Sequence, residues 1–261
     1  MTEQAILTEK RGAVGVLTIN RPKTLNALNV PTLLEMEAVL STFEADAEVR
    51  VIVVTGAGDR AFIAGGDIAD LDSRRGLEHY QEFAEVIHRV FRRFEDCDKP
   101  TIGAINGWAL GGGTELLLTL DIRLVAEEAK LGLPEITLGL FPGAGGSQRI
   151  IRQVPLCRAK ELMFTGDQIS AAEAVALGLC NRTVPRAQLM EQAFALAERI
   201  AQKSPLTLKL LKRSMRQGIE MPLGAALSYE QAVIGLVLDS NDAHEGCRAF
   251  LEKRTAQFKG D

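Results

Sequence analysis

The sequence is poor in the residues that build metal centres and nucleophilic triads. It has three histidines and four cysteines in 261 residues, and none of them falls at a metal-ligand spacing. The cysteines are Cys97, Cys157, Cys180 and Cys247, and the histidines are His79, His88 and His244. The spacing leads us to expect no metal. Scattered thiols are typical of a reducing compartment, so we expect a cytoplasmic protein with free cysteines, although a trimmed organellar enzyme would show the same pattern. The histidines lie in charged, helical stretches and are interpreted as surface residues.

Long hydrophobic runs are also missing, and we expect no secretory leader. The N-terminal stretch MTEQAILTEKRG has no apolar core, which a secretory signal would require. The longest uncharged stretches, such as residues 100–114, are too short and too rich in glycine to span a bilayer. We therefore expect no contact with a membrane.

The composition does not favour nucleic-acid binding, and two catalytic motifs are absent. Acidic residues number 34 and basic residues 30, the net charge is −4, and aromatics are 5%, whereas RNA recognition uses a basic surface with aromatics for stacking. No G-x-S-x-G elbow and no G-x-x-x-x-G-K-[ST] loop occurs, which argues against a serine hydrolase and a P-loop enzyme. The run GLFPGAGGSQR lacks the G-x-G-x-x-G spacing of a dinucleotide site.

Strand and helix patterns alternate in the first part of the chain. Strands are predicted over residues 13–20 and 49–58, and helices over residues 30–46 and 77–97. The first helix begins after Asn29, a suitable N-cap, and the second carries one apolar stripe. This alternation by itself favours a doubly wound α/β sheet.

The second part of the chain is mostly helical. Ser170 and Glu173 form a capping-box pattern before a helix rich in alanine. From residue 187 onwards the pattern is helical, with interruptions near Pro205 and Pro222. The length fits one α/β domain followed by a helical region.

Three glycine-rich segments each carry a carboxylate: FIAGGDI (62–68), GWALGGGTEL (107–116) and LGLPEITLGLFPGAGGSQR (131–149). Glycine permits close approach of the backbone to a ligand, and amides at a helix N-terminus attract negative charge. Two such amides converging from different loops make an oxyanion hole, so Gly66 and Gly112 are candidate donors for a carbonyl oxygen. Turns alone would also explain each segment taken singly.

Glu115 stands at the head of an otherwise apolar segment, where burying a carboxylate is costly. We expect this cost to be offset by water, by the helix N-terminus and by Glu135, with which it would share a proton. A solvated acid in the first turn of a helix is the simpler alternative for either residue.

Four segments together resemble the crotonase (enoyl-CoA hydratase/isomerase) family, and among its members the enoyl-CoA hydratases. They are NRPKTLNALN, AFIAGGDIADL, the block from GWALGGG to GGSQR, and the closing AFLEKRTAQF. The resemblance covers essentially the whole chain. It implies a spiral of ββα units in residues 1–200 and a helical oligomerisation region in residues 201–261, which would assemble trimers or hexamers. The doubly wound sheet would then be replaced by this crotonase-like spiral.

The resemblance also implies roles for individual residues. Glu115 and Glu135 align with the two catalytic acids of the hydratases, and Gly66 and Gly112 with the oxyanion-hole amides. The residues that align with segments lining the coenzyme A site are Lys23, Thr24, Leu25, Ala64, Asp67 and Ile68. Phe250 and Lys253 align with residues that reach the coenzyme A of a neighbouring subunit, although Lys253 could equally be a solvated charge.

The implied reaction is hydration of a 2-enoyl-CoA to a 3-hydroxyacyl-CoA by a hydro-lyase, with no separate cofactor because coenzyme A belongs to the substrate. A Δ3,Δ2-enoyl-CoA isomerase is the nearest alternative, but family isomerases often lack an acid at the position of Glu115. Other reactions through a thioester enolate remain open, because one oxyanion hole serves them all. An RNA-binding or non-catalytic role on the same scaffold is the alternative of a different class.

Overall fold

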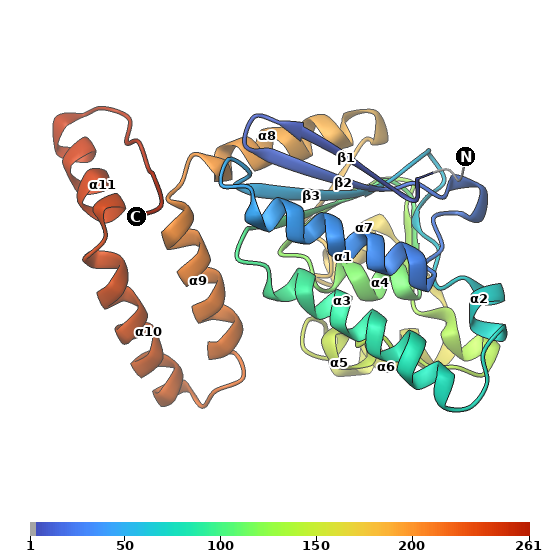
Figure 1. Ribbon diagram of the computed structural model, residues 1–261. Coiled ribbons are helices and arrows are strands. Elements are labelled where there is room, and N and C mark those ends of the chain that lie inside the picture. The colour runs from blue at the N-terminus through green and yellow to red at the C-terminus, as the bar shows by residue number, and fades with distance from the viewer. Residues whose placement is uncertain (1–3) are drawn as a thin grey trace.

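Two β-sheets form the body of the protein, which the computed structural model describes over residues 4–261 (Figure 1). The first three residues of the stretch that argued against a secretory signal therefore lie outside the described part. The larger sheet has the order β1-β2-β3-β5-β7-β10 and the smaller one β4-β6-β8-β9. The strands β1–β10 are Ile6–Arg11, Val14–Ile19, Val51–Gly56, Ala61–Ile63, Thr101–Ile105, Trp108–Leu110, Ile122–Ala126, Lys130–Gly132, Gln168–Ser170 and Arg182–Val184.

From β3 to β8, consecutive strands alternate between the two sheets. β3, β5 and β7 pair in parallel within the larger sheet, and each is followed at once by β4, β6 or β8 of the smaller sheet. Only two residues separate β5 from β6, too few for the crossover that parallel neighbours in one sheet need. The doubly wound sheet suggested by the alternation of patterns is therefore wrong. The chain winds as a spiral of ββα units, as the family resemblance implied.

The α-helices α1–α11 are Val30–Ala45, Ile68–Asp72, Glu85–Asp96, Gly112–Leu117, Gly146–Ile150, Leu156–Thr165, Ala171–Ala176, Leu189–Ala201, Pro205–Gly218, Leu223–Leu238 and Asn241–Glu252. Short 3-10 helices cover Pro22–Thr24, Pro134–Leu138 and Arg186–Gln188, and a π-helix covers His79–Ala84. No helix described within residues 4–261 is long and apolar enough to cross a membrane.

The local signals for helix starts are confirmed. The side chain of Asn29 accepts a hydrogen bond from the N–H of Thr32 at 3.0 Å and caps α1. Ser170 and Glu173 form a reciprocal capping box at α7. The predicted helix over residues 77–97 divides into the π-helix and α3, and the stripe of α3 is buried against the core.

Buried strands hold the site in place. β3 is buried along its whole length, as expected for a central strand with both faces covered. Helix α8 contacts β2, β3, β5 and β7 on one side of the larger sheet, while α1 contacts β1, β2 and α3. The ends of the strands of both sheets thereby become fixed points for the glycine-rich loops.

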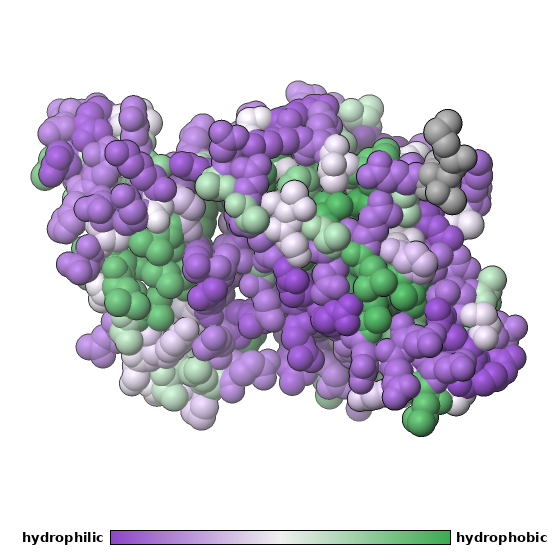
Figure 2. Space-filling model, in the orientation of Figure 1, coloured by the Kyte–Doolittle hydropathy of each residue, from purple (hydrophilic) through white to green (hydrophobic). Residues whose placement is uncertain are grey.

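The last three helices lie apart from the body (Figure 1). Pro205 begins α9 and Pro222 precedes α10, so both predicted interruptions are confirmed. The exposed large apolar side chains of α10 are Leu223, Leu227, Ile234, Leu236 and Leu238. Figure 2 shows a hydrophobic area on these separated helices. The division after residue 200 and the assembly role of this region stay predictions.

Candidate active site

The segment around Leu25 pairs with the loop that follows β4. The N–H of Ala64 donates to the carbonyl of Leu25 at 3.0 Å, the N–H of Leu28 to Gly65 at 2.9 Å, and the N–H of Asp67 to Leu28 at 2.8 Å. These bonds bring together the two segments that were assigned to coenzyme A on the family resemblance.

A left-handed turn shapes the first of these segments. Leu25 and Asn26 have φ values of 54° and 59°, which are uncommon for residues other than glycine. The buried side chain of Asn26 holds the turn, because it accepts from the N–H of Arg21 at 2.9 Å and donates to the carbonyls of Ala57 and Ala61 at 3.0 and 2.8 Å. Lys23 and Thr24 precede the turn and are exposed.

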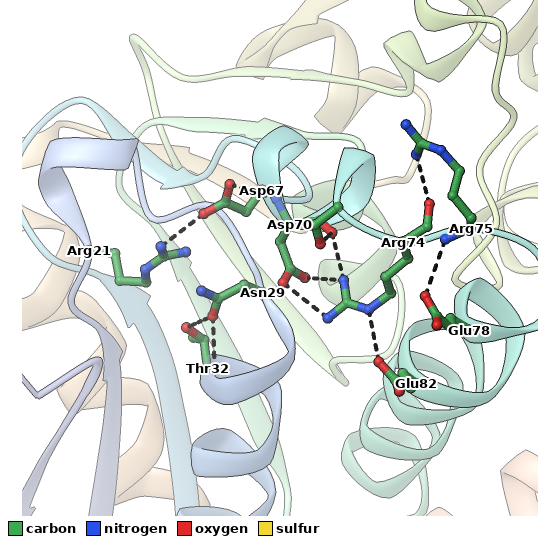
Figure 3. Close-up of polar contacts among 10 residues, drawn as sticks. Arg21, Asn29, Thr32, Asp67, Asp70, Arg74, Arg75, Glu78 and Glu82 are labelled. Carbon is green, nitrogen blue, oxygen red and sulfur yellow. Dashed lines mark hydrogen bonds and ion pairs between the residues drawn. The ribbon is translucent and has the colours of Figure 1, made fainter.

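The second segment ends in a polar network (Figure 3). Asp67 caps α2 and pairs with Arg21 at 2.9 Å, and both side chains are about four-fifths buried. Arg74 then pairs with Asp70 at 2.9 Å and with Glu82 at 3.4 Å, which ties α2 to the π-helix. The carboxylate of Asp67 is therefore engaged within the protein, while Ile68 beside it is 54% exposed.

The glycine run after β6 packs its backbone against this loop. A Cβ added to Gly113 would lie 2.1 Å from the carbonyl oxygen of Ile63, so only glycine fits there. A Cβ added to Gly112 would lie 3.7 Å from the amide nitrogen of Gly66. Within residues 4–261 neither Gly66 nor Gly112 donates its N–H to a hydrogen bond. Two unused amide donors thus meet where β4 and β6 end.

Glu115 lies in the first turn of α4 and is 3% exposed. Its Oε1 accepts hydrogen bonds from the N–H groups of Ala144 and Gly146, both at 2.8 Å. Gly146 is the first residue of α5 and Ala144 lies two residues before it, so the donors come from the start of a second helix and from the loop that leads into it. The run FPGAGG, which sequence reasoning grouped only as a glycine-rich segment, therefore holds the buried carboxylate. A glycine-rich run directly before a helix presents free backbone N–H groups, and this pattern could have predicted that the run binds a carboxylate.

Glu135 lies in the 3-10 helix Pro134–Leu138. Both of its carboxylate oxygens are buried and have no hydrogen-bond partner within the described residues. A Cβ added to Gly111 would lie 3.1 Å from Oε1 of Glu135, so the glycine run and this carboxylate are in direct contact. An unpartnered buried carboxyl group favours its neutral form.

The two acids share one electrostatic environment. Burial raises the pKa of Glu115 most, and the nearby carboxylate of Glu135 raises it further, to about 7. The hydrogen bonds from Gly146 and Ala144 lower this pKa and oppose part of the shift. Burial also raises the pKa of Glu135. Raised carboxyl pKa values in an enclosed site are characteristic of acid–base chemistry near neutrality.

Two predicted site residues lie elsewhere in this chain. Phe250 is in α11 and 83% exposed, and Lys253 follows that helix with a φ of 56°. Figure 1 places α11 at the far end of the separated helices, on the opposite side of the molecule from α2. The structure does not bring these two residues to Glu115, and their contact with a neighbouring subunit stays a prediction.

Comparison with known proteins identifies the family. The sequence profile described as enoyl-CoA hydratase/isomerase matches residues 9–261. The chain belongs to the enoyl-CoA hydratase/isomerase family. A short-chain-enoyl-CoA hydratase of Clostridium acetobutylicum is 41% identical over 249 residues, which are 95% of each protein. A crotonyl-CoA hydratase of Syntrophomonas wolfei is 42% identical over 258 residues, which are 99% of each.

The structural relationship is equally close. The crystal structure of an enoyl-CoA hydratase from Bacillus anthracis superposes with a TM-score of 0.95 at 39% identity, covering 99% of this chain and all of the other. This agreement includes the helices α9–α11, since nearly the whole chain is covered. The spiral fold is therefore that of the enoyl-CoA hydratase/isomerase family.

Proposed function

We propose that this protein is an enoyl-CoA hydratase, which adds water across the 2,3 double bond of a 2-enoyl-CoA to give a 3-hydroxyacyl-CoA. The observation that carries the proposal is the meeting of two buried acids with two unused backbone amides. Full-length relatives named as hydratases at about 40% identity support the same reaction.

In this proposal the amides of Gly66 and Gly112 hold the thioester oxygen. When the water oxygen adds to the β-carbon, negative charge develops on the thioester oxygen. The two fixed N–H donors stabilise that charge. Loss of one such donor costs about 3–4 kcal/mol in other enzymes. Because both donors belong to the backbone, rigid strand ends fix their positions more firmly than side-chain rotamers would.

Glu115 and Glu135 divide the proton transfers. Glu115, whose Oε1 is fixed by two amides, takes a proton from water as the water oxygen bonds to the β-carbon. Glu135, whose unpartnered carboxyl oxygens favour the neutral form, gives a proton to the α-carbon. One proton enters the pair and one leaves it, so the pair returns to its starting charge, and its apparent pKa values belong to both groups.

The test is a steady-state assay with crotonyl-CoA, followed by loss of the absorbance of the conjugated enoyl thioester. We expect turnover without an added metal or organic cofactor. A 3-enoyl-CoA assayed in parallel measures the isomerase alternative, and a series of acyl lengths and branches defines the substrate. Dominant conversion of the 3-enoyl substrate, with no hydration of any 2-enoyl-CoA, would replace hydration by isomerisation.

We further infer that the protein self-associates as a trimer or as a hexamer built from two trimers. The exposed large apolar side chains of α10 support this, because a large exposed apolar surface is uncommon on a monomer. Light scattering should give three or six times the chain mass of 28.3 kDa. A monomer at working concentration contradicts it.

A further inference from the structure

A two-pronged ion pair lies behind the loop that holds Glu115. Arg149 of α5 donates from Nε to both carboxylate oxygens of Glu95 at 3.2 Å and from Nη2 to Oε2 at 2.8 Å. Glu95 belongs to α3. The side chain of Arg149 is 14% exposed and that of Glu95 is 31% exposed. Such a fork between largely buried partners fixes the guanidinium in one orientation.

The third nitrogen of the same guanidinium holds the loop. Nη1 of Arg149 donates to the carbonyl of Ala144 at 3.1 Å. It also lies directly over Gly145, where an added Cβ would fall 2.1 Å from Nη1 and where φ is +98°. Gly145 therefore has to be glycine for both its backbone conformation and the close approach of Arg149.

Ala144 connects this pair to the acid. Its carbonyl accepts from Arg149, while its N–H donates to Oε1 of Glu115 at 2.8 Å. The loop Ala144–Gly146 is thus held on one side by a buried carboxylate and on the other by an oriented guanidinium. Displacement of Arg149 would release the peptide that fixes the acid.

Charge acts in the same direction as geometry. The groups that act on Glu115 are Glu135, which raises its pKa, and Arg149, which lowers it, together with the two amide donors. The guanidinium therefore favours the carboxylate form, which the proposed base requires. A lysine at this position would supply charge but no fork.

We propose that Arg149, oriented by Glu95, is a positioning residue for the hydration step, which it serves by holding the loop Ala144–Gly146 against Glu115. The inference rests on the proposed hydratase function. We expect the pair to affect kcat rather than KM, because neither side chain is hydrogen-bonded to Gly66, to Gly112 or to the segments expected to bind coenzyme A. Arg149 would contribute in two ways: its fork to Glu95 holds the loop in place, and its positive charge favours the carboxylate form of Glu115.

The experiment compares Arg149→Met, Arg149→Lys and Glu95→Gln with a control, Arg89→Met. Arg89 makes a fork of similar bond lengths to Glu37, at 3.0, 3.3 and 3.0 Å. Its side chain is more exposed than that of Arg149, and it joins α3 to α1. Hydration of crotonyl-CoA is measured over a range of pH, with melting temperature as the measure of folding. Wild-type enzyme that hydrates no enoyl-CoA refutes the proposed function itself.

With active wild-type enzyme, we expect Arg149→Met to lower kcat about 10- to 100-fold, the cost of misplacing a reacting group by about 1 Å, with a far smaller change in KM. The pH below which the activity of Arg149→Met falls should be higher than in the wild type by about 0.5–1 pH unit, because a nearby cation is lost. Arg149→Lys should lower kcat with a smaller shift of that pH, and Arg89→Met should leave both unchanged.

Equal kcat and pH profiles for Arg149→Met and Arg89→Met overturn the proposal. If Arg149→Met does not fold, Glu95→Gln decides, because it keeps the cation and removes the charge that orients it. A fall in kcat for Glu95→Gln with the melting temperature of the control supports the positioning role, and unchanged kcat refutes it.

Discussion

The side chain of Glu115 lies against Gly146 so closely that this glycine serves as both a donor and a space. Its N–H donates to Oε1 of Glu115 at 2.8 Å. A Cβ on the same residue would fall 2.6 Å from Cγ and 2.7 Å from Oε1. The position of the Glu115 carboxylate therefore depends on the absence of a Cβ at residue 146.

Gly146→Ala should therefore lower kcat for enoyl-CoA hydration about 10- to 100-fold, because the acid must shift from its place. Gly143→Ala in the same loop is the matched control, since its Cβ would meet only a carbonyl at 3.5 Å, an ordinary contact. Steady-state kinetics on both variants make the comparison. Similar kcat values for the two variants would show that the position of Glu115 does not limit the reaction.

Replacement of either acid by its amide should abolish most turnover. Glutamine keeps the volume of Glu115 and Glu135 but cannot exchange a proton, and removal of an acid–base group costs about 100- to 10,000-fold. Stopped assays with crotonyl-CoA measure the loss, and circular dichroism checks the fold. Near-native turnover by Glu115→Gln or Glu135→Gln would show that the two-acid assignment is wrong.

The rate of hydration should fall as the pH drops through the neutral range. Glu115 has a pKa raised to about 7 by burial and by Glu135, and the proposed base acts as a carboxylate. Protonation below that value removes the base. The measurement is kcat/KM for crotonyl-CoA against pH, because this parameter reports the ionisations of the free enzyme. A flat profile from about pH 5 to 8 contradicts the prediction.

The same shift predicts how stability depends on pH. Between pH 4.5 and about 7, the unfolded chain has lost the proton of Glu115 while the folded protein keeps it. The wild-type protein therefore loses stability as the pH rises across that window, by about 3 kcal/mol at about 1.4 kcal/mol per unit. Glu115→Gln lacks this loss and its amide oxygen can still accept from both N–H groups.

Urea unfolding at a fixed protein concentration compares the two proteins. We expect Glu115→Gln to gain on the wild type by about 3 kcal/mol between about pH 4.5 and pH 7.5. A difference that stays constant with pH would mean that the carboxyl titrates alike in both states.

Two neighbouring glycines of the run, Gly112 and Gly113, should respond differently to alanine. Gly113→Ala places a Cβ 2.1 Å from the backbone of Ile63, which cannot yield easily, so we expect a fall in unfolding free energy of at least about 2 kcal/mol. Gly112→Ala meets only ordinary contacts at 3.7–3.8 Å and should fold normally. Thermal unfolding of both variants tests this, and equal destabilisation would contradict the packing of α4 on β4.

Much of the local structure was predictable because its causes are local. The capped starts of α1 and α7, the interruptions at Pro205 and Pro222, and the apolar stripe of α3 all depend on neighbours within a few residues. The spiral was not predictable from alternation, because period and length do not say which sheet a strand joins. The connection from β5 to β6 has only two residues, which is too short for a crossover within one sheet, so β6 pairs with strands of the smaller sheet.

The sequence by itself determined which residue types were available: three glycine-rich loops, two glutamates 20 residues apart and a helical C-terminal region. Tertiary structure alone decided how Glu115 is held, since the donors Ala144 and Gly146 stand about 30 residues beyond it. It also decided that Arg149 and Glu95, on separate helices, meet behind that loop. Hydrogen bonds and ion pairs act over a few ångströms, and only the folded backbone sets which distant residues come that close.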